Sequence, residues 1–267
     1  MAFGSWNWKD RNAGGSGLLY EPGNWGDLLK LSWLAAILRW KGRKGVSVYF
    51  DPFAGDVGYP LSGAGRARFN QAGADELDLI KKPFVEAGNW PSAATLAGRL
   101  PVGRRLLFDS DPEKRGRWAR TPGVEVLAGE SGWAIAAARR PEADELWLLD
   151  PYDFLADWQK FPPPAPPGSG AASVLLYLYN RSAENSAIFS AYREFCRWLK
   201  NSPGGRKSFR GRLAADAFLP RAHHEMHFLP GRADAERNDF SELSAVLKRL
   251  SLALAAAQAG EAIFTVL

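Results

Sequence analysis

The chain has 267 residues, of which 46% are hydrophobic and 24% are charged, and its formal net charge is +5. The length suits one large α/β domain, and the basic charge suits a polyanionic partner. The single cysteine, Cys196, excludes an intrachain disulfide and a cysteine-based zinc cluster, so a cytoplasmic location is expected. No apolar run approaches the roughly 20 residues of a membrane span, so no membrane association is expected.

The beginning of the chain predicts an arm, a helix and a strand. Residues 1–17 end in Asn-Ala-Gly-Gly-Ser-Gly, which indicates a flexible N-terminal arm, and residues 18–267 are expected to form a single domain. Residues 27–40 have apolar side chains at helical spacing and predict an amphipathic helix. Residues 46–51 are apolar and β-branched, which predicts the first strand.

The segment that follows is longer than an ordinary crossover needs. About fifty residues separate Pro52 from Gly103, and their helical pattern predicts a helical insertion over about residues 60–102. Strands and helices then alternate, which favours a parallel sheet with right-handed crossovers. The predicted strands are 104–109, 123–128, 145–150 and 172–180, and the predicted helices are 112–120, 132–139 and 186–200.

Two further strands, 222–229 and 261–267, flank a long predicted helix at 239–257. The total is seven strands. Five parallel units followed by strand, helix and strand is the order of elements in the class I S-adenosylmethionine-dependent methyltransferases, whose last strand inserts antiparallel. The sequence therefore predicts an α/β protein with a Rossmann-like class I methyltransferase fold. Its sheet would be mostly parallel and seven-stranded, with the last strand antiparallel and the helical insertion after the first strand.

The loop after the first predicted strand is a candidate cofactor site. Asp51 at the strand end can order the loop, while Gly55 and Gly58 let the backbone approach a ligand. The loop lacks both GxGxxG and the Walker Lys-Ser/Thr pair, which argues against a dinucleotide site or a P-loop. The alternative is an ordinary glycine-containing turn. Asp109, after the next strand, lies where an acid commonly binds ribose hydroxyls, with Asp111 as a rival or as a helix cap.

The most pointed motif is Asp150-Pro151-Tyr152-Asp153-Phe154. The Asp150 carboxylate and the Pro151 carbonyl can hold an exocyclic amine, while the ring of Tyr152 or Phe154 stacks on the base. The alternative is an Asp-Pro turn at the end of a strand. No metal is needed for such chemistry. The segment 223–227 collects all three histidines but lacks HExxH spacing and falls on a predicted strand, so no metal site is expected.

Three basic clusters, at residues 39–44, 115–120 and 206–212, are each predicted to be solvated loops rather than phosphate contacts. Several of them on one face of the protein would instead favour a nucleic-acid partner.

Two segments resemble a known family. Gly23-Asn24-Trp25-Gly26-Asp27-Leu28-Leu29-Lys30 and Tyr49-Phe50-Asp51-Pro52-Phe53-Ala54-Gly55 are similar to the signature of the bacterial large-subunit (23S) rRNA adenine-N6 methyltransferases of the J type. That family has a GNxxDxLKH segment, a DTHAGAG loop, a helical insertion and a DPPY motif. The three-Cys-motif partner proteins share the FAG loop more distantly. The resemblance implies S-adenosylmethionine as the cofactor and a nucleic acid as the substrate, RNA rather than DNA.

Carried over by position, the resemblance makes Asp150 the catalytic aspartate, with Pro151, Tyr152 and Phe154 beside it. The implied cofactor-binding residues are Lys30, Asp51, Phe53, Gly55, Gly58, Ser92, Asp109, Ser131 and Gly132. The sequence departs from the family at three of its cofactor positions: Leu31 and Phe53 replace histidines, and Ser131 replaces an aspartate. The second proline of DPPY is also absent, which shifts the aromatic residue by one position.

The leading hypothesis is a methyltransferase that uses S-adenosylmethionine to methylate an exocyclic amine of a nucleic-acid base, with adenine N6 of RNA as the first choice. The replaced cofactor residues motivate an alternative from another class. In that alternative the chain is a catalytically degenerate methyltransferase fold that serves as a binding or assembly subunit for a protein partner. A methyltransferase for a protein or small-molecule amine is the third hypothesis.

Overall fold

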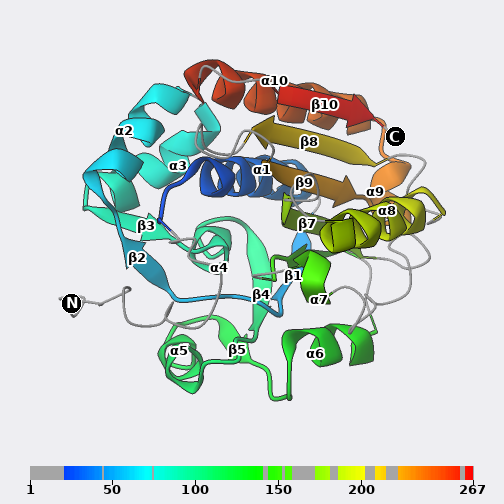
Figure 1. Cartoon of the computed structure of the whole chain (residues 1–267). Helices are drawn as coiled ribbons and strands as arrows, with labels where there is room; N and C mark the ends of the chain where they lie inside the picture. The colour runs from blue at the N-terminus through cyan, green and yellow to red at the C-terminus, as the bar shows by residue number, and fades with distance from the viewer. Residues whose placement is uncertain are drawn as a thin grey trace.

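An eight-stranded sheet runs through the centre of the molecule, with helices on both of its faces (Figure 1). The computed structural model describes residues 21–43, 45–73, 75–140, 144–151, 154–157, 172–180, 186–201, 208–214, 222–258 and 262–266. The predicted N-terminal arm and Tyr152 lie outside these described residues.

The strand order is β10-β8-β9-β7-β6-β1-β4-β5. The strands of this sheet are β1 (Val46–Asp51), β4 (Val102–Leu107), β5 (Val124–Val126), β6 (Glu145–Leu149), β7 (Ser173–Asn180), β8 (Phe209–Ala214), β9 (His223–Leu229) and β10 (Ala262–Val266). From β5 to β7 all neighbouring strands are parallel. β9 is antiparallel to both β7 and β8, and β10 is antiparallel to β8. The structure therefore confirms the Rossmann-like class I methyltransferase fold, with a mostly parallel sheet and an antiparallel last strand.

The strand count is a correction, because the sheet has eight strands instead of seven. The missed strand is β8, whose first four residues, Phe-Arg-Gly-Arg, belong to the cluster at 206–212 that was predicted to be a solvated loop. Phe209 and Leu213 point into the core, while Arg210 and Arg212 form ion pairs with the buried Glu225 of β9. The strand inserted between two others is β9, and β10 forms an edge of the sheet.

The helices divide between the two faces of the sheet. α1 (Trp25–Gly42), α2 (Gly63–Ala72), α4 (Ala93–Ala97), α5 (Pro112–Trp118) and α10 (Phe240–Gln258) share one hydrophobic core, and α6 (Gly132–Ala138), α7 (Phe154–Asp157) and α8 (Ser186–Asn201) share the other. The short helix α9 (Arg232–Ala235) follows β9. None of the helices that the structure describes combines the length and apolarity needed to cross a bilayer.

The first helix, α1, is buried on nearly all sides rather than on one stripe as predicted. α10 and α4 lie beside it on the same face of the sheet and contact it, so α1 is covered by helices as well as by the sheet. Lys41, from a cluster that was predicted to be solvated, is buried and paired with Asp234. This burial fixes α1 relative to the ends of the strands.

The chain between β1 and β4 forms the predicted helical insertion, together with a two-stranded antiparallel sheet that was not predicted. Its elements besides α2 and α4 are β2 (Gly58–Pro60), the 3-10 helix η2 (Asp75–Leu77), α3 (Asp78–Ile80), the π-helix η3 (Lys81–Val85) and β3 (Asn89–Pro91). Pairing of β2 with β3 brings Tyr59 opposite the buried Trp90. The insertion thereby covers the loop that follows β1.

Gly211 in the middle of β8 lets α1 and α10 pack closely on the sheet. A Cβ atom there would overlap the ring of Trp33 and approach Ser251 Oγ to 3.0 Å. We expect Gly211→Ala to lower the free energy of unfolding by about 1–3 kcal/mol, because a core without spare room must shift. Urea denaturation measures this loss. Gly116→Ala is the control: that helical position has open space around it, so the substitution should be neutral or stabilising. Equal effects of the two variants would contradict this account of β8.

Candidate active site

Three predicted acidic residues follow the carboxyl ends of neighbouring parallel strands. Asp51 ends β1, Asp109 follows β4 and Asp150 follows β6. In the sheet β1 lies between β4 and β6. The chain passes from β1 to β4 and β5 on one side of β1, and then to β6 and β7 on the other side. The crevice between β1 and β6 is therefore the topological switch point, where open α/β sheets bind ligands.

A cavity of about 50 Å³ lies at this switch point. It brings together six of the residues that the sequence nominated: Lys30, Asp51, Phe53, Gly55, Ser92 and Asp150. They come from α1, from the loop after β1, from the start of α4 and from the end of β6. Residues up to 120 positions apart in the sequence thus share one small space.

An ion pair between Lys30 and Asp150 closes one side of the cavity. The Lys30 ammonium lies 2.6 Å from Asp150 Oδ2 and 3.3 Å from Asp27 Oδ1. Burial alone lowers the pKa of Lys30, but the charges of Asp150 and Asp27 outweigh burial and hold the pKa well above its usual value. Burial raises the pKa of Asp150, and Lys30 opposes that rise. Lys30 is therefore a fixed cation at neutral pH.

Asp51 is a buried carboxyl group on the other side of the cavity. It accepts hydrogen bonds from Tyr49 Oη at 2.9 Å and from the Phe53 backbone N–H at 3.0 Å. Burial raises its pKa to about 7, and the nearby charge of Asp150 contributes. Asp51 therefore orders the loop after β1, as the sequence suggested, and changes its charge near neutral pH.

Gly55 and its neighbours form a tightly held loop. Asp56 pairs with Arg117 of α5 through two hydrogen bonds of 2.7 and 2.8 Å, and Trp118 Nε1 donates to the Gly55 carbonyl at 3.0 Å. The Tyr59 hydroxyl accepts from the Asp56 N–H and would contact a Cβ at position 55. Burial raises the pKa of Tyr59 to about 12, so its hydroxyl stays neutral. The loop is thus attached to α5 and to the insertion.

Two residues nominated from the family resemblance act as helix N-caps. Ser92 Oγ caps α4 by accepting from the Thr95 N–H at 3.2 Å, and it lies 3.3 Å from the Val57 carbonyl oxygen. Ser131 caps α6 through the Ala134 N–H at 3.1 Å. A capping hydroxyl satisfies one of the free N–H groups at a helix start. Ser92 lines the cavity; Ser131 is on the neighbouring helix start, outside it.

Phe53 takes up space beside the cavity. Its ring packs edge-on against Trp133 with the ring centres 5.1 Å apart. It also lies so close to Gly132 that a Cβ there would overlap both the ring and the Pro52 carbonyl oxygen. Trp133 is buried, and its indole N–H has no hydrogen-bond partner in the described structure. Phe53 and Gly132 are therefore a close-packed pair, and the Phe53 ring limits the volume of the cavity.

Asp109 is partly exposed and is held by its own loop. Its carboxylate accepts from the Asp111 N–H at 2.8 Å and lies 3.4 Å from the Lys114 ammonium. Asp111 caps α5 by accepting from the Glu113 N–H at 2.9 Å. The helix-cap alternative therefore describes Asp111, and Asp109 is left as the candidate for binding ribose.

Of the two aromatic residues after Asp150, the structure describes Phe154. Phe154 is only 3% exposed and packs against Trp133 and Phe195. A ring in that position belongs to the core, so the structure argues against base stacking by Phe154. Tyr152 is outside the described residues, and Pro151 is buried. Stacking by Tyr152 stays a prediction.

Sequence reasoning missed three polar residues behind the ion pair. Asp27 contacts Lys30 and accepts from the Gly23 N–H at 3.0 Å. Lys30 lies 5.2 Å from the centre of the Tyr177 ring, and the Tyr177 hydroxyl is 2.8 Å from Nδ1 of His224. Burial, helped by the charge of Lys30, lowers the pKa of His224 to about 3, so His224 is neutral. The i,i+3 spacing of Asp27 and Lys30 was the available signal; Tyr177 and His224 offered none.

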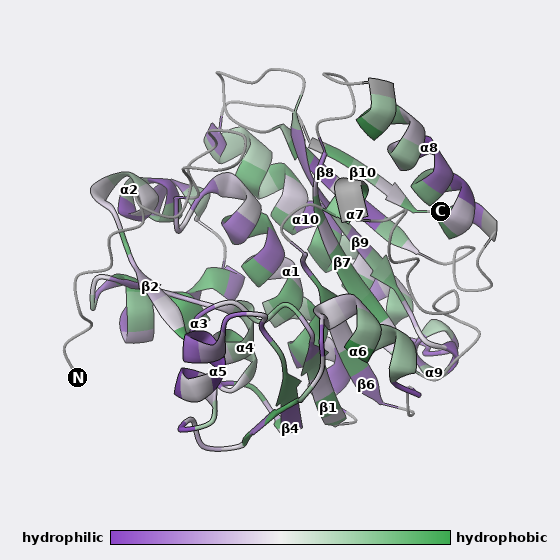
Figure 2. Cartoon of the chain, turned by 60° about the horizontal axis from the view of Figure 1, so that its bottom comes forward, coloured by the Kyte–Doolittle hydropathy of each residue, from purple (hydrophilic) through white to green (hydrophobic). Residues whose placement is uncertain are grey.

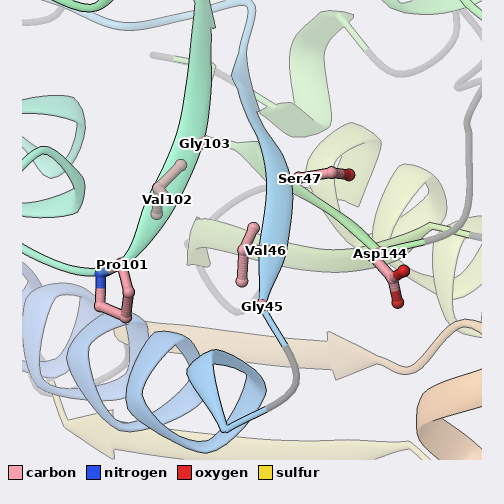
Figure 3. Close-up of a pocket in the computed structure, with 7 residues that line it drawn as sticks. All are labelled: Gly45, Val46, Ser47, Pro101, Val102, Gly103 and Asp144. Carbon is pink, nitrogen blue, oxygen red and sulfur yellow. The ribbon is translucent and has the colours of Figure 1, made fainter.

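A larger hollow, of about 460 Å³, lies at the opposite edge of the sheet. Figure 3 shows it between the beginnings of β1 and β4, with Val46 pointing toward Val102 and with Ser47 and Asp144 pointing away. Asp144 is its one charged residue. A hollow at the amino ends of the strands with so few polar groups lacks the features of a catalytic site, so we favour the carboxyl edge.

The pKa of Asp51 generates a prediction about stability. A carboxyl group with a raised folded-state pKa stabilises the protein fully below about pH 4, where unfolded aspartate titrates, and this contribution is lost as the pH rises through about 7. We therefore expect the stability difference between wild type and Asp51→Asn to fall from pH 4 to pH 7 and then to level off. Urea denaturation at intervals of pH measures it. Asp144→Asn, an exposed position, is the control, and a difference that is constant with pH would contradict the assignment.

The sequence matches no protein-family model, and no curated protein is significantly similar to it. Among solved structures, LPL1258 of Legionella pneumophila strain Philadelphia 1, described by the family model DUF519, matches with a TM-score of 0.64 and 16% identity. The match covers 92% of this chain and 97% of that protein.

Two more distant similarities have lower scores. A probable spermidine synthase of Corynebacterium glutamicum has a TM-score of 0.44 and 10% identity, covering 90% of this chain and 74% of its own. The plantazolicin methyltransferase BpumL, in complex with SAH, has a TM-score of 0.37 and 10% identity, covering 77% and 84%. TM-scores this low do not establish a shared fold. The chain shares its fold with LPL1258 over nearly the whole length of both proteins.

Proposed function

We propose that this protein is an S-adenosylmethionine-dependent methyltransferase that acts on an exocyclic amine of a nucleic-acid base, with adenine N6 of RNA as the first candidate. One observation carries the proposal. In a fold of the class I methyltransferase type, Asp51 and Asp150 line the same cavity at the switch point of the sheet, together with Lys30. The resemblance to the J-type rRNA methyltransferases supplies the choice of adenine, and the net charge of +5 supports a polyanionic substrate.

The charge of the cavity supports a cationic cofactor. Asp27, Asp51 and Asp150 supply three carboxyl groups, and Lys30 supplies one ammonium. When bound, S-adenosylmethionine supplies an electrophilic methyl group on a positively charged sulfonium. An excess of carboxylates in a partly buried site attracts a cation more strongly than the same groups would in water. By charge, the residues present fit this cofactor.

The chain's own part in the reaction is to hold the amine and take its proton. Lys30 binds Asp150 Oδ2, and Asp150 Oδ1 has no hydrogen bond in the described structure. We assign Oδ1 and the Pro151 carbonyl to the two N–H groups of the amine. The cofactor would supply the methyl group, with its methyl carbon–sulfur bond broken and S-adenosylhomocysteine as the leaving group, while one N–H proton of the amine would pass to Asp150 or to water. Lys30 keeps the Asp150 carboxylate oriented during this transfer.

A second candidate function follows from the volume of the cavity. Ligand pockets usually measure about 300–1,000 Å³, whereas this cavity measures about 50 Å³ with the Phe53 ring against Gly132. If Phe53 keeps that position, no cofactor enters, and the chain is a degenerate methyltransferase fold used as a binding or assembly subunit. Cofactor binding therefore separates the two candidates.

Calorimetry and methyl transfer test the leading proposal together. We expect wild-type protein to bind S-adenosylhomocysteine and to methylate RNA that has been stripped of its natural methyl groups. Asp150→Asn should keep cofactor affinity within about threefold and slow transfer by roughly a hundredfold or more, because the amine loses its proton acceptor. Asp144→Asn, at the other edge of the sheet, is the matched control and should behave as wild type. Transfer to a protein extract but not to RNA would contradict the choice of substrate.

Shortening Phe53 tests the second candidate. If the ring acts as a plug, wild type will show no binding heat with S-adenosylhomocysteine, and Phe53→Ala will gain it because the cavity opens. Under the leading proposal both proteins bind. Phe264→Ala, which removes another partly buried ring whose ring contacts, Trp33 and Phe209, do not line the cavity, controls for loosened packing. Absence of binding in both wild type and Phe53→Ala, with both folded, would contradict the methyltransferase proposal.

A further inference from the structure

Two arginines of β8 converge on one buried carboxylate. Glu225 is fully buried and lies 3.0 Å from Arg210 and 2.9 Å from Arg212. Asn180 at 2.8 Å and the Tyr192 hydroxyl at 3.2 Å also donate to it. A carboxylate has about four acceptor positions, whereas two guanidinium groups alone carry ten N–H donors. This cluster therefore has one positive charge in excess and N–H groups to spare.

The excess charge faces solvent. The side chains of Arg210 and Arg212 each keep 23% of their surface exposed, although Glu225 between them keeps none. His227 lies 3.2 Å from Glu225. Burial lowers the pKa of His227, so its ring is neutral and adds no charge to the cluster. A second anion from outside would complete the charge balance and use the remaining N–H groups.

The neighbouring helix α8 adds an exposed aromatic ring and further cations. Its apolar residues Ala191, Phe195 and Leu199 pack on the sheet, and Figure 2 shows hydrophilic and hydrophobic residues alternating along the helix. On its outer side Phe189 is 47% exposed, and the Arg193 guanidinium lies 5.9 Å from its ring centre.

Cations outnumber carboxylates across these elements. α8 and β8 together with Glu225 carry five cationic side chains and two carboxylates in the described structure: Arg193, Arg197, Lys200, Arg210 and Arg212 against Glu194 and Glu225. An exposed ring beside arginines is the combination that binds single-stranded nucleic acid, through stacking and phosphate contacts.

This surface lies at the same edge of the sheet as Asp150. α8 follows β7, and Tyr192 already contacts Glu225, which pairs with Leu178 near the end of β7. Phe189, one turn earlier in α8, is therefore closer still to the carboxyl edge. In the sheet β8 is three strands from β6, which corresponds to roughly 14 Å at the usual strand spacing. A short stretch of single strand spans that distance.

We propose that Phe189, Arg193, Arg210 and Arg212, here called the α8–β8 surface, bind the nucleic-acid strand next to the base held at Asp150. The arginines contact phosphates, and Phe189 stacks on an unpaired base. This inference rests on the proposed function and adds to it the surface that positions the substrate. Single-stranded RNA is favoured over an acidic peptide, because RNA offers unpaired bases that stack on the exposed Phe189 ring, whereas aspartate and glutamate side chains do not stack.

Fluorescence anisotropy with the full chain and a labelled single-stranded RNA of about 12 nucleotides tests the surface without any cofactor. Arg193→Gln should weaken binding roughly threefold to tenfold and make the salt dependence shallower by about 0.7 in log–log slope, because one phosphate contact is lost. Phe189→Ser should weaken binding about fivefold to a hundredfold and leave the salt slope unchanged. Arg39→Gln is the matched control: it is an exposed helical arginine at the end of α1, which lies toward the other edge of the sheet, and it should bind as wild type.

Two outcomes would overturn the inference: binding by Arg193→Gln and Phe189→Ser equal to that of Arg39→Gln, or equal competition by a poly-glutamate peptide. Both test positions are exposed, so thermal unfolding should match wild type, and Arg212→Gln serves as a second phosphate-contact variant. S-adenosylhomocysteine calorimetry on the same samples separates this inference from the proposed function. If wild type binds the cofactor and the surface variants bind RNA as wild type does, only the inference about the α8–β8 surface is wrong. If the surface variants bind RNA more weakly but no protein binds the cofactor, the proposed methyltransferase function is wrong and the protein is an RNA-binding protein.

Discussion

The ion pair between Lys30 and Asp150 is the constraint on which the candidate site depends. It joins α1 to the end of β6 across 120 residues of sequence, and both partners are largely removed from solvent. Loss of Lys30 would leave both Asp27 and Asp150 without their shared cation, and removing one partner of a buried pair typically costs about 3–5 kcal/mol. The cavity therefore exists only when α1 is docked, and the burial of α1 against the sheet and against α10 secures that docking.

The antiparallel strand β9 connects this ion pair to the α8–β8 surface. Successive residues of a strand point to opposite faces, so His224 and Glu225 serve different sides of the sheet. His224 meets Tyr177 on the side of α1, where the lack of a side chain at Gly26 leaves room for both rings. Glu225 gathers Arg210 and Arg212 on the side of α8. One strand thus links the proposed amine site to the α8–β8 surface.

The sequence predicted those parts of the fold whose cause is local. β1 and β6 are continuous apolar runs that end at an acid, so both the strands and the positions of Asp51 and Asp150 could be inferred. β8 was missed because its alternation places arginines on the face toward α8, and their neutralising partner, Glu225, lies in the next strand. The size of the cavity and the core position of Phe154 depend on packing between distant elements. No residue pattern within one segment contains that information.

The negative charge of the cavity favours binding of a cationic cofactor, whereas its small volume opposes binding. The energies of the two effects decide between them. The negative lining is set by residues anchored in α1, β1 and β6, so it survives small movements. Among the side chains that limit the volume, Phe53 is partly exposed, and its edge-on contact with Trp133 is worth about 0.5–1.5 kcal/mol. An opening cost of about 1.4 kcal/mol weakens a ligand only about tenfold, whereas micromolar binding releases about 8 kcal/mol. A closed cavity of this kind is therefore compatible with cofactor binding, and the electrostatic indication outweighs the steric one.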